Sequence, residues 1–163
     1  MTFRKLSVLA WMLGSLALVP LEAVRATEPQ DALLMVAGTS FSGDDISFAS
    51  VKSAFRGQRI RIDGQSVIPI NHPLNSPGRV SFDRITLGLE PTEVGRFWID
   101  MRIRDQGRPP TIASTPELAL RIVEALKGAI TYAVPSPALA RLRIKILTVE
   151  GKSAGQPGYP LTR

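Results

Sequence analysis

The chain has 163 residues but no cysteine and only one histidine. Without cysteine there is no disulfide framework, so packing alone must hold the fold, and no lipid anchor can be attached to a cysteine. If the protein is exported, the absence of cysteine is more typical of a protein of the bacterial periplasm than of a eukaryotic secreted module. Any function must therefore come from a packed core and the groups that it positions.

The lack of cysteine and the single histidine also limit the chemistry that the chain can perform. A metal site needs several nitrogen, sulfur or carboxylate ligands that converge, and no such spacing is present. His72 is interpreted as a polar loop residue, and Asp44 and Asp45 as a turn before a helix. No Gly-x-Ser-x-Gly elbow places a serine as a nucleophile. We expect no enzyme activity, no metal and no cofactor.

Only the N-terminus has a long apolar run. Arg4 and Lys5 precede apolar residues 6–21, Pro20 interrupts them, and Val24-Arg25-Ala26 resembles a signal peptidase site. A membrane span needs roughly 20 apolar residues, so a cleaved signal peptide over residues 1–26 is favoured over an uncleaved anchor. The sequence thus predicts export to the periplasm.

The chain without the predicted signal peptide has the size of one domain, which is predicted over residues 27–150. Residues 151–163 are rich in glycine, proline and serine, which predicts a flexible tail. The net charge of +6 is spread along the chain rather than gathered in runs. It is therefore compatible with an anionic partner, and no nucleic acid is expected.

Apolar patterning predicts an alternation of strands and helices. Short apolar runs predict strands at residues 32–37, 67–71 and 129–134, and alternation predicts a charged edge strand at 142–146. Apolar residues at helical spacing, with caps and stop glycines, predict helices at residues 47–55, 79–87, 91–101 and 116–127. The order predicts an α/β fold, a small mixed, mostly parallel sheet flanked by helices.

Polar loops follow two of these strands. Thr39 and Ser40 come after the first, and residues 75–79 come after the second and open a helix. Ligands bind at such strand ends in open α/β sheets, and a helix N-terminus offers free N–H groups to an anion. Ser76 could add a hydroxyl and Arg79 a two-pronged guanidinium. The alternative is ordinary capping by Ser76, with Arg79 in solvent.

Several short segments carry a family resemblance over most of residues 33–149. They are residues 54–57 (AFRG), 63–70 (DGQSVIPI), 76–82 (SPGRVSF), 87–88 (LG), 97–98 (FW), 107–110 (GRPP) and 127–132 (KGAITY). In this order and spacing, the chain resembles the small periplasmic proteins related to phosphate ABC-transporter substrate-binding proteins. It differs in Pro77, which has no N–H, and in being about half as long as the larger members.

The resemblance implies one lobe of a periplasmic-binding-protein fold that binds phosphate or a similar anion for ABC transport. It places Ser76, Gly78 and Arg79 at the family's phosphate loop, with Thr39 and Ser40 at a strand-end hydroxyl position, and implies a membrane transporter as partner. Two alternatives stay open. One is an interaction module that kept the lobe and binds another periplasmic protein. The other is binding of cell-surface polyanions through Arg141, Arg143 and Lys145.

Overall fold

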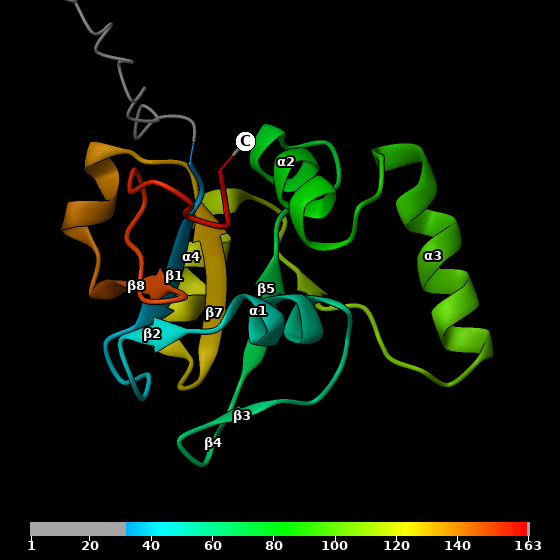
Figure 1. The fold of residues 1–163 in the computed structure, drawn as a ribbon, viewed down its shortest axis with the longest axis horizontal. Helices are drawn as coiled ribbons and strands as arrows, with labels where there is room; N and C mark the ends of the chain where they lie inside the picture. Colours follow the sequence, from blue (N-terminus) through cyan, green and yellow to red (C-terminus); the bar gives the residue numbers. More distant parts are fainter. Residues whose placement is uncertain (1–31, 163) are drawn as a thin grey trace, which may run out of the picture.

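The computed structural model describes residues 32–162, so the predicted signal peptide lies outside the described residues. The strands are β1 (Leu34–Gly38), β2 (Asp45–Ile46), β3 (Arg61–Ile62), β4 (Gln65–Ser66), β5 (Ile68–Asn71), β6 (Thr111–Ile112), β7 (Ala129–Ala133) and β8 (Ile144–Val149). The helices are α1 (Phe48–Phe55), α2 (Pro77–Thr86), α3 (Pro91–Ile103), α4 (Pro116–Ala125) and the 3-10 helix η2 (Pro137–Arg141). Figure 1 shows their arrangement.

Six strands form the main sheet, in the order β2-β8-β1-β7-β5-β6. All of them run in one direction except β1, which is antiparallel to both of its neighbours, β7 and β8. The strands β3 and β4 form a separate hairpin. The predicted small mixed, mostly parallel sheet flanked by helices is therefore confirmed.

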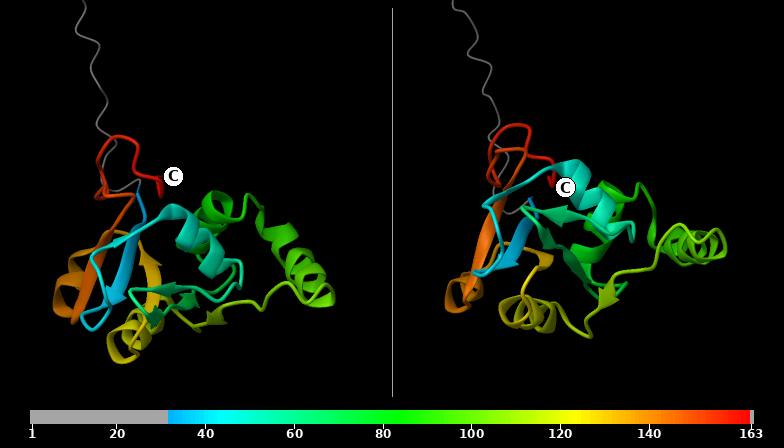
Figure 2. Two further views of the ribbon diagram at one scale, coloured as in Figure 1. Left: turned by 60° about the horizontal axis from the view of Figure 1, so that its bottom comes forward. Right: turned by 90° about the horizontal axis from the view of Figure 1, so that it is seen from below.

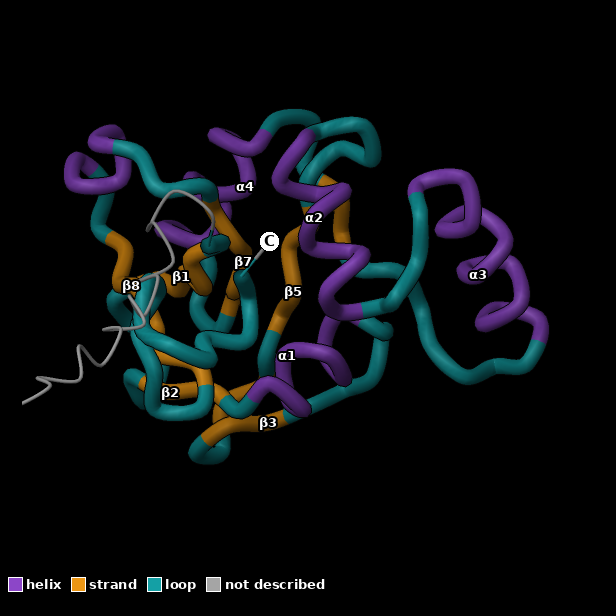
Figure 3. Tube along the Cα trace, turned by 45° about the horizontal axis from the view of Figure 1, so that its top comes forward, coloured by secondary structure: helices purple, strands orange, loops and turns teal. Residues whose placement is uncertain are grey.

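Helices cover both faces of the sheet (Figures 2 and 3). Alternate residues of β1 and its flank point to opposite sides: Leu33 and Met35 belong to the core under α1 and α2, whereas Leu34 and Val36 belong to the core under α4. All five residues of β1 are buried for this reason. The unbroken apolar run that predicted this strand thus reflects burial on two sides.

The sheet has two ends, which we name by the direction of its parallel strands. At the carboxyl edge β5 and β6 lead to α2 and α4, and β7 leads to η2. At the amino edge lie the starts of β5, β6 and β7. Because β1 is reversed, its first residue, Leu34, pairs with Ala133 at the end of β7, and its last residues lie at the amino edge. A loop after β1 is therefore far from a loop after β5.

The strand predicted at residues 142–146 is present as β8, and residues 144–146 have a strand partner on one side only, which agrees with the predicted edge position. β1 pairs along one side of β8, and the two residues of β2 pair on the other side only with Thr148 and Val149. Ile146 keeps 53% of its surface exposed, so one face of this strand is in contact with water.

The segment after Gly151, for which composition predicts a flexible tail, is packed against the domain up to Thr162. Tyr159 and Leu161 are buried in the core. The Leu33 N–H donates to the Leu161 carbonyl at 2.8 Å, and the Tyr159 hydroxyl donates to the Leu33 carbonyl at 2.9 Å. Two large side chains among the glycines and prolines are enough to anchor the segment.

α3 stands apart from the rest of the domain (Figure 1). Val94 is its one buried residue, although Phe97, Trp98 and Met101 share that side of the helix and are half-buried. Ile99 and Ile103 lie on the opposite side and are 61% and 77% exposed. Within residues 32–162, no helix combines the length and the apolar character needed to cross a membrane.

Candidate functional site

The carboxyl edge contains a cavity of about 310 Å³ between the first turns of α2 and α4. His72, Ser76, Glu117 and Ser136 supply its polar side chains. The rest of the lining is apolar or glycine, contributed by Pro77, Gly78, Pro116, Leu120, Ala133, Val134, Ala138 and Leu139. No lysine or arginine is part of this lining. The cavity therefore combines an apolar wall with the N-terminal ends of two helices.

The first turn of α2 keeps free donors beside this cavity. Ser76 is the N-cap residue, but its hydroxyl donates to the Pro73 carbonyl at 2.9 Å and caps no helix N–H. Pro77 occupies the first helical position, where its missing N–H costs nothing. Within residues 32–162, the N–H groups of Gly78 and Arg79 have no acceptor. The capping that the sequence suggested for Ser76 does not occur, so two donors remain for a ligand.

The Arg79 side chain is neither solvated nor turned to the cavity. It is 1% exposed, its Nε donates to Asp83 Oδ2 at 2.5 Å, and one Nη donates to the His72 carbonyl at 3.1 Å. Burial raises the pKa of Asp83, and the adjacent Arg79 guanidinium opposes that rise. Arg79 therefore ties α2 to the end of β5, and its guanidinium is not available to an anion in the cavity.

His72, interpreted from sequence as a polar loop residue, is buried, with 3% of its surface exposed. Its ring packs against Tyr132 at a tilt of 34°, with 4.2 Å between ring centroids, and Nε2 lies 3.3 Å from Thr131 Oγ1. Burial first, and then the Arg79 charge, lower the pKa of His72 from 6.5 to about 4, against the opposing charge of Glu117. His72 is therefore neutral at neutral pH.

Thr39 and Ser40 do not join this site. Both are exposed and follow β1, at the amino edge. The prediction assumed that the first two strands are parallel, whereas β1 is antiparallel to β7 and β5 is parallel to β7. The structure brings Ser76 and Gly78 together with His72 and Glu117, a set that only three-dimensional packing reveals.

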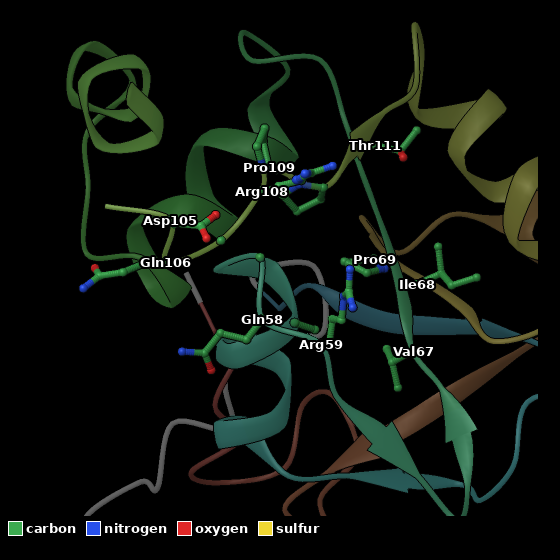
Figure 4. A pocket seen from close by; sticks show the side chains of 14 residues that line it. Gln58, Arg59, Val67, Ile68, Pro69, Asp105, Gln106, Arg108, Pro109 and Thr111 are labelled. Carbon is green, nitrogen blue, oxygen red and sulfur yellow. The ribbon is translucent and has the colours of Figure 1, made fainter. Parts of the chain in front are cut away.

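A wider cleft of about 720 Å³ lies at the amino edge, between the end of α1 and the loop that precedes β6. Arg59 and Arg108 come from these two segments and line the cleft from either side (Figure 4). The segments touch closely at Gly57, where a Cβ would lie 2.2 Å from the Arg108 carbonyl oxygen and φ is +80°. Both arginines are exposed, so the cleft is charged and open to water.

No family model matches the sequence, and no curated protein matches it. Solved structures do match the fold. An ABC-type phosphate transport receptor from Vibrio cholerae aligns with a TM-score of 0.55 and 12% identity, over 76% of this chain and 48% of that one. A putative phosphate ABC transporter substrate-binding protein from Clostridium perfringens, solved with bound phosphate, aligns with a TM-score of 0.55 and 14% identity, over 76% and 47%.

PstS from Borrelia burgdorferi aligns with a TM-score of 0.59 and 16% identity, over 82% of this chain and 55% of that one. The chain thus spans about half the length of the solved structures that it matches. The predicted resemblance is confirmed at the level of fold: this protein has the architecture of one lobe of the phosphate ABC-transporter substrate-binding proteins.

Proposed function

We propose that this protein is a periplasmic solute-binding lobe that holds a phosphate-type oxyanion at the carboxyl edge. The observation that carries the proposal is the pair of unpartnered N–H groups, on Gly78 and Arg79, at the end of α2 that lines the cavity. The similar solved structures are described as a phosphate transport receptor and a phosphate substrate-binding protein, which supports the same ligand class.

The binding geometry follows from the start of α2. The first-turn N–H groups point out of the helix end, where the helix dipole also favours negative charge. Gly78 has no side chain, so an oxygen atom can come close to the backbone there. Arg79 acts as a positioning residue, because its guanidinium donates to the His72 carbonyl and so fixes the His72 loop against α2. No bond is made or broken in this function, and delivery to a membrane transporter is its expected use.

Nuclear magnetic resonance tests this proposal directly. Titration of the purified protein with inorganic phosphate or a phosphate monoester should shift the amide signals of Gly78 and Arg79 saturably. The amides of Thr39 and Ser40, at the opposite edge, are the internal control and should not follow the same curve. If neither ligand moves the two α2 amides, or if only the amides around Arg59 and Arg108 respond, the proposal is wrong.

The second candidate function is docking of a protein partner, and α3 is the observation that favours it. Ile99 and Ile103 lie one turn apart and remain 61% and 77% exposed, so together they present apolar surface to a partner. Replacing both with lysine should abolish such docking without changing the oxyanion titration. The two functions are therefore separable by variants in two different helices.

A further inference from the structure

The ring of His72 presents an unused acceptor beside the free N–H groups of α2. Thr131 Oγ1 donates its one hydrogen to the Ile70 carbonyl at 2.9 Å, so it must accept from His72 Nε2, 3.3 Å away. The hydrogen of the neutral ring therefore sits on Nε2, and Nδ1 carries a lone pair. Nδ1 has no hydrogen-bond partner within the described part of the chain, although the residue is only 3% exposed.

That lone pair is close to the oxyanion position. His72 and Gly78 both line the cavity, and a Cβ placed on Gly78 would lie 3.8 Å from Nδ1. The space in front of Gly78 therefore adjoins Nδ1. The N–H groups require acceptor oxygens, whereas Nδ1 requires a donor, so the bound head group must carry both.

The remaining lining restricts the ligand further. Glu117 places a carboxylate at the cavity, and no cationic side chain is present to balance a doubly charged anion. Leu120, Val134 and Leu139 offer apolar surface that an inorganic ion would leave in contact with water. A ligand with a single negative charge and an apolar body satisfies both features.

We propose that the ligand is an organic phosphate bound as its monoanion, a phosphate monoester or phosphonate with a small apolar substituent. Its protonated oxygen donates to His72 Nδ1, and its charged oxygens accept from the Gly78 and Arg79 N–H groups. The apolar substituent packs against Leu120 and Leu139. This inference rests on the proposed oxyanion function and specifies the form of phosphate that the cavity selects.

Affinity should then depend on the protonation of the ligand. A phosphate monoester loses its second proton near pH 6, so the monoanion is scarce at pH 8 and prevalent at pH 5.5. The groups that act on the His72 ring are Arg79 on α2, Glu117 on α4, and Thr131 and Tyr132 on β7. With a pKa of about 4, His72 keeps its lone pair at pH 5.5.

Calorimetric titration with phenyl phosphate, phenyl sulfate and inorganic phosphate tests the inference. Phenyl phosphate should bind at least about tenfold more tightly than inorganic phosphate, and its affinity should rise more than about tenfold from pH 8 to pH 5.5. Phenyl sulfate, which has the same apolar body and charge but no proton to donate, should bind at least about tenfold more weakly than phenyl phosphate at pH 5.5.

Two glycine variants make a matched pair. In Gly78→Ala, the new methyl group meets Val134, His72 and Tyr132 at 3.7 to 3.9 Å, which is ordinary contact, so the fold should hold while the space before Nδ1 is filled. Binding of phenyl phosphate should be lost. Gly95→Ala on α3, where nothing lies within 4 Å, should leave binding unchanged.

The outcomes separate the two proposals. If inorganic phosphate and phenyl phosphate bind equally, or phenyl sulfate binds as well as phenyl phosphate, this inference is overturned while the oxyanion function stands. If no phosphate compound binds, or if Gly78→Ala does not abolish the binding, both the oxyanion function and this inference are wrong. Tight phenyl phosphate binding that increases on acidification supports both.

Discussion

The two edges of the sheet differ in the burial and pairing of their arginine side chains. At the carboxyl edge, Arg79 is buried, is bound to Asp83 and the His72 carbonyl, and stays out of the cavity. At the amino edge, Arg59 and Arg108 line an open cleft from exposed positions (Figure 4). The carboxyl edge thus has free backbone donors but no cationic side chain in its cavity. The amino edge has cationic side chains, and its cleft is the more open of the two.

The difference shows why charge alone is a poor guide to a binding site. Exposed guanidinium groups interact with an anion through water and salt, and each loses side-chain entropy on binding. Backbone N–H groups at a helix end are already ordered, and low-dielectric surroundings strengthen their interaction with an anion. These arguments support the proposal that the ligand binds at the carboxyl edge rather than at the amino edge.

Replacing Arg79 with alanine should have the largest effect on stability. The substitution leaves Asp83 buried without its ion-pair partner and frees the His72 carbonyl. We expect the free energy of unfolding, measured by urea denaturation, to fall by about 3–5 kcal/mol.

Arg84 on the same helix supplies the control. Its ion pair with Glu90 is half exposed, so Arg84→Ala should leave the denaturation midpoint nearly unchanged. The double variant Arg79→Met with Asp83→Leu removes both buried charges, and it should be more stable than Arg79→Ala. Equal midpoints for Arg79→Ala and Arg84→Ala would show that Arg79 is not a buried anchor.

The next largest effect concerns Leu161, at the end of the chain. Its side chain is fully buried, and its backbone pairs with Leu33 just before β1, on the carboxyl-edge side of the sheet. Leu161→Ala should lower the free energy of unfolding by about 2–5 kcal/mol. Hydrogen exchange should show protection of the Leu33 amide in the parent protein. A freely exchanging Leu33 amide would restore the prediction of a flexible tail.

A smaller effect should appear on acidification. The pKa of His72 is lowered from 6.5 to about 4, so the unfolded chain binds more protons than the folded one between these values. Stability should therefore fall as pH decreases from about 6.5 toward 4, by up to about 1.4 kcal/mol per pH unit. The raised pKa of Asp83 acts in the opposite direction in its own range. His72→Gln isolates the histidine contribution and should flatten the difference between pH 6.5 and 4.5; parallel curves would contradict it.

The sequence predicted the elements well because their signals are local. The helix predicted at residues 47–55, for example, is present as α1, and proline begins α2 and α4 at the first helical position. Sequence patterns did not predict strand direction or side-chain burial where these depend on residues far along the chain. The direction of β1 is set by pairing with β7 and β8, and the burial of His72 by packing under Tyr132.

The candidate site was predicted only in part for the same reason. The Ser76-Pro77-Gly78 turn was found because proline and a small residue mark a helix start. The other contributors lie on α4, β7 and η2, at sequence separations that no local pattern connects. Arg79 illustrates the limit most clearly: its position in the loop was predicted, but its pairing with Asp83 one turn later turned the side chain inward.

The smallest expected effect completes the comparison of the two edges. Arg59→Ala and Arg108→Ala should each change the free energy of unfolding by less than about 0.5 kcal/mol, because neither residue makes an ion pair among residues 32–162. Phenyl phosphate titration of the double variant should match the parent protein, since the site lies at the opposite edge. A tenfold loss of affinity would instead move the anion site to the open cleft, and the free N–H groups of α2 would then need another partner.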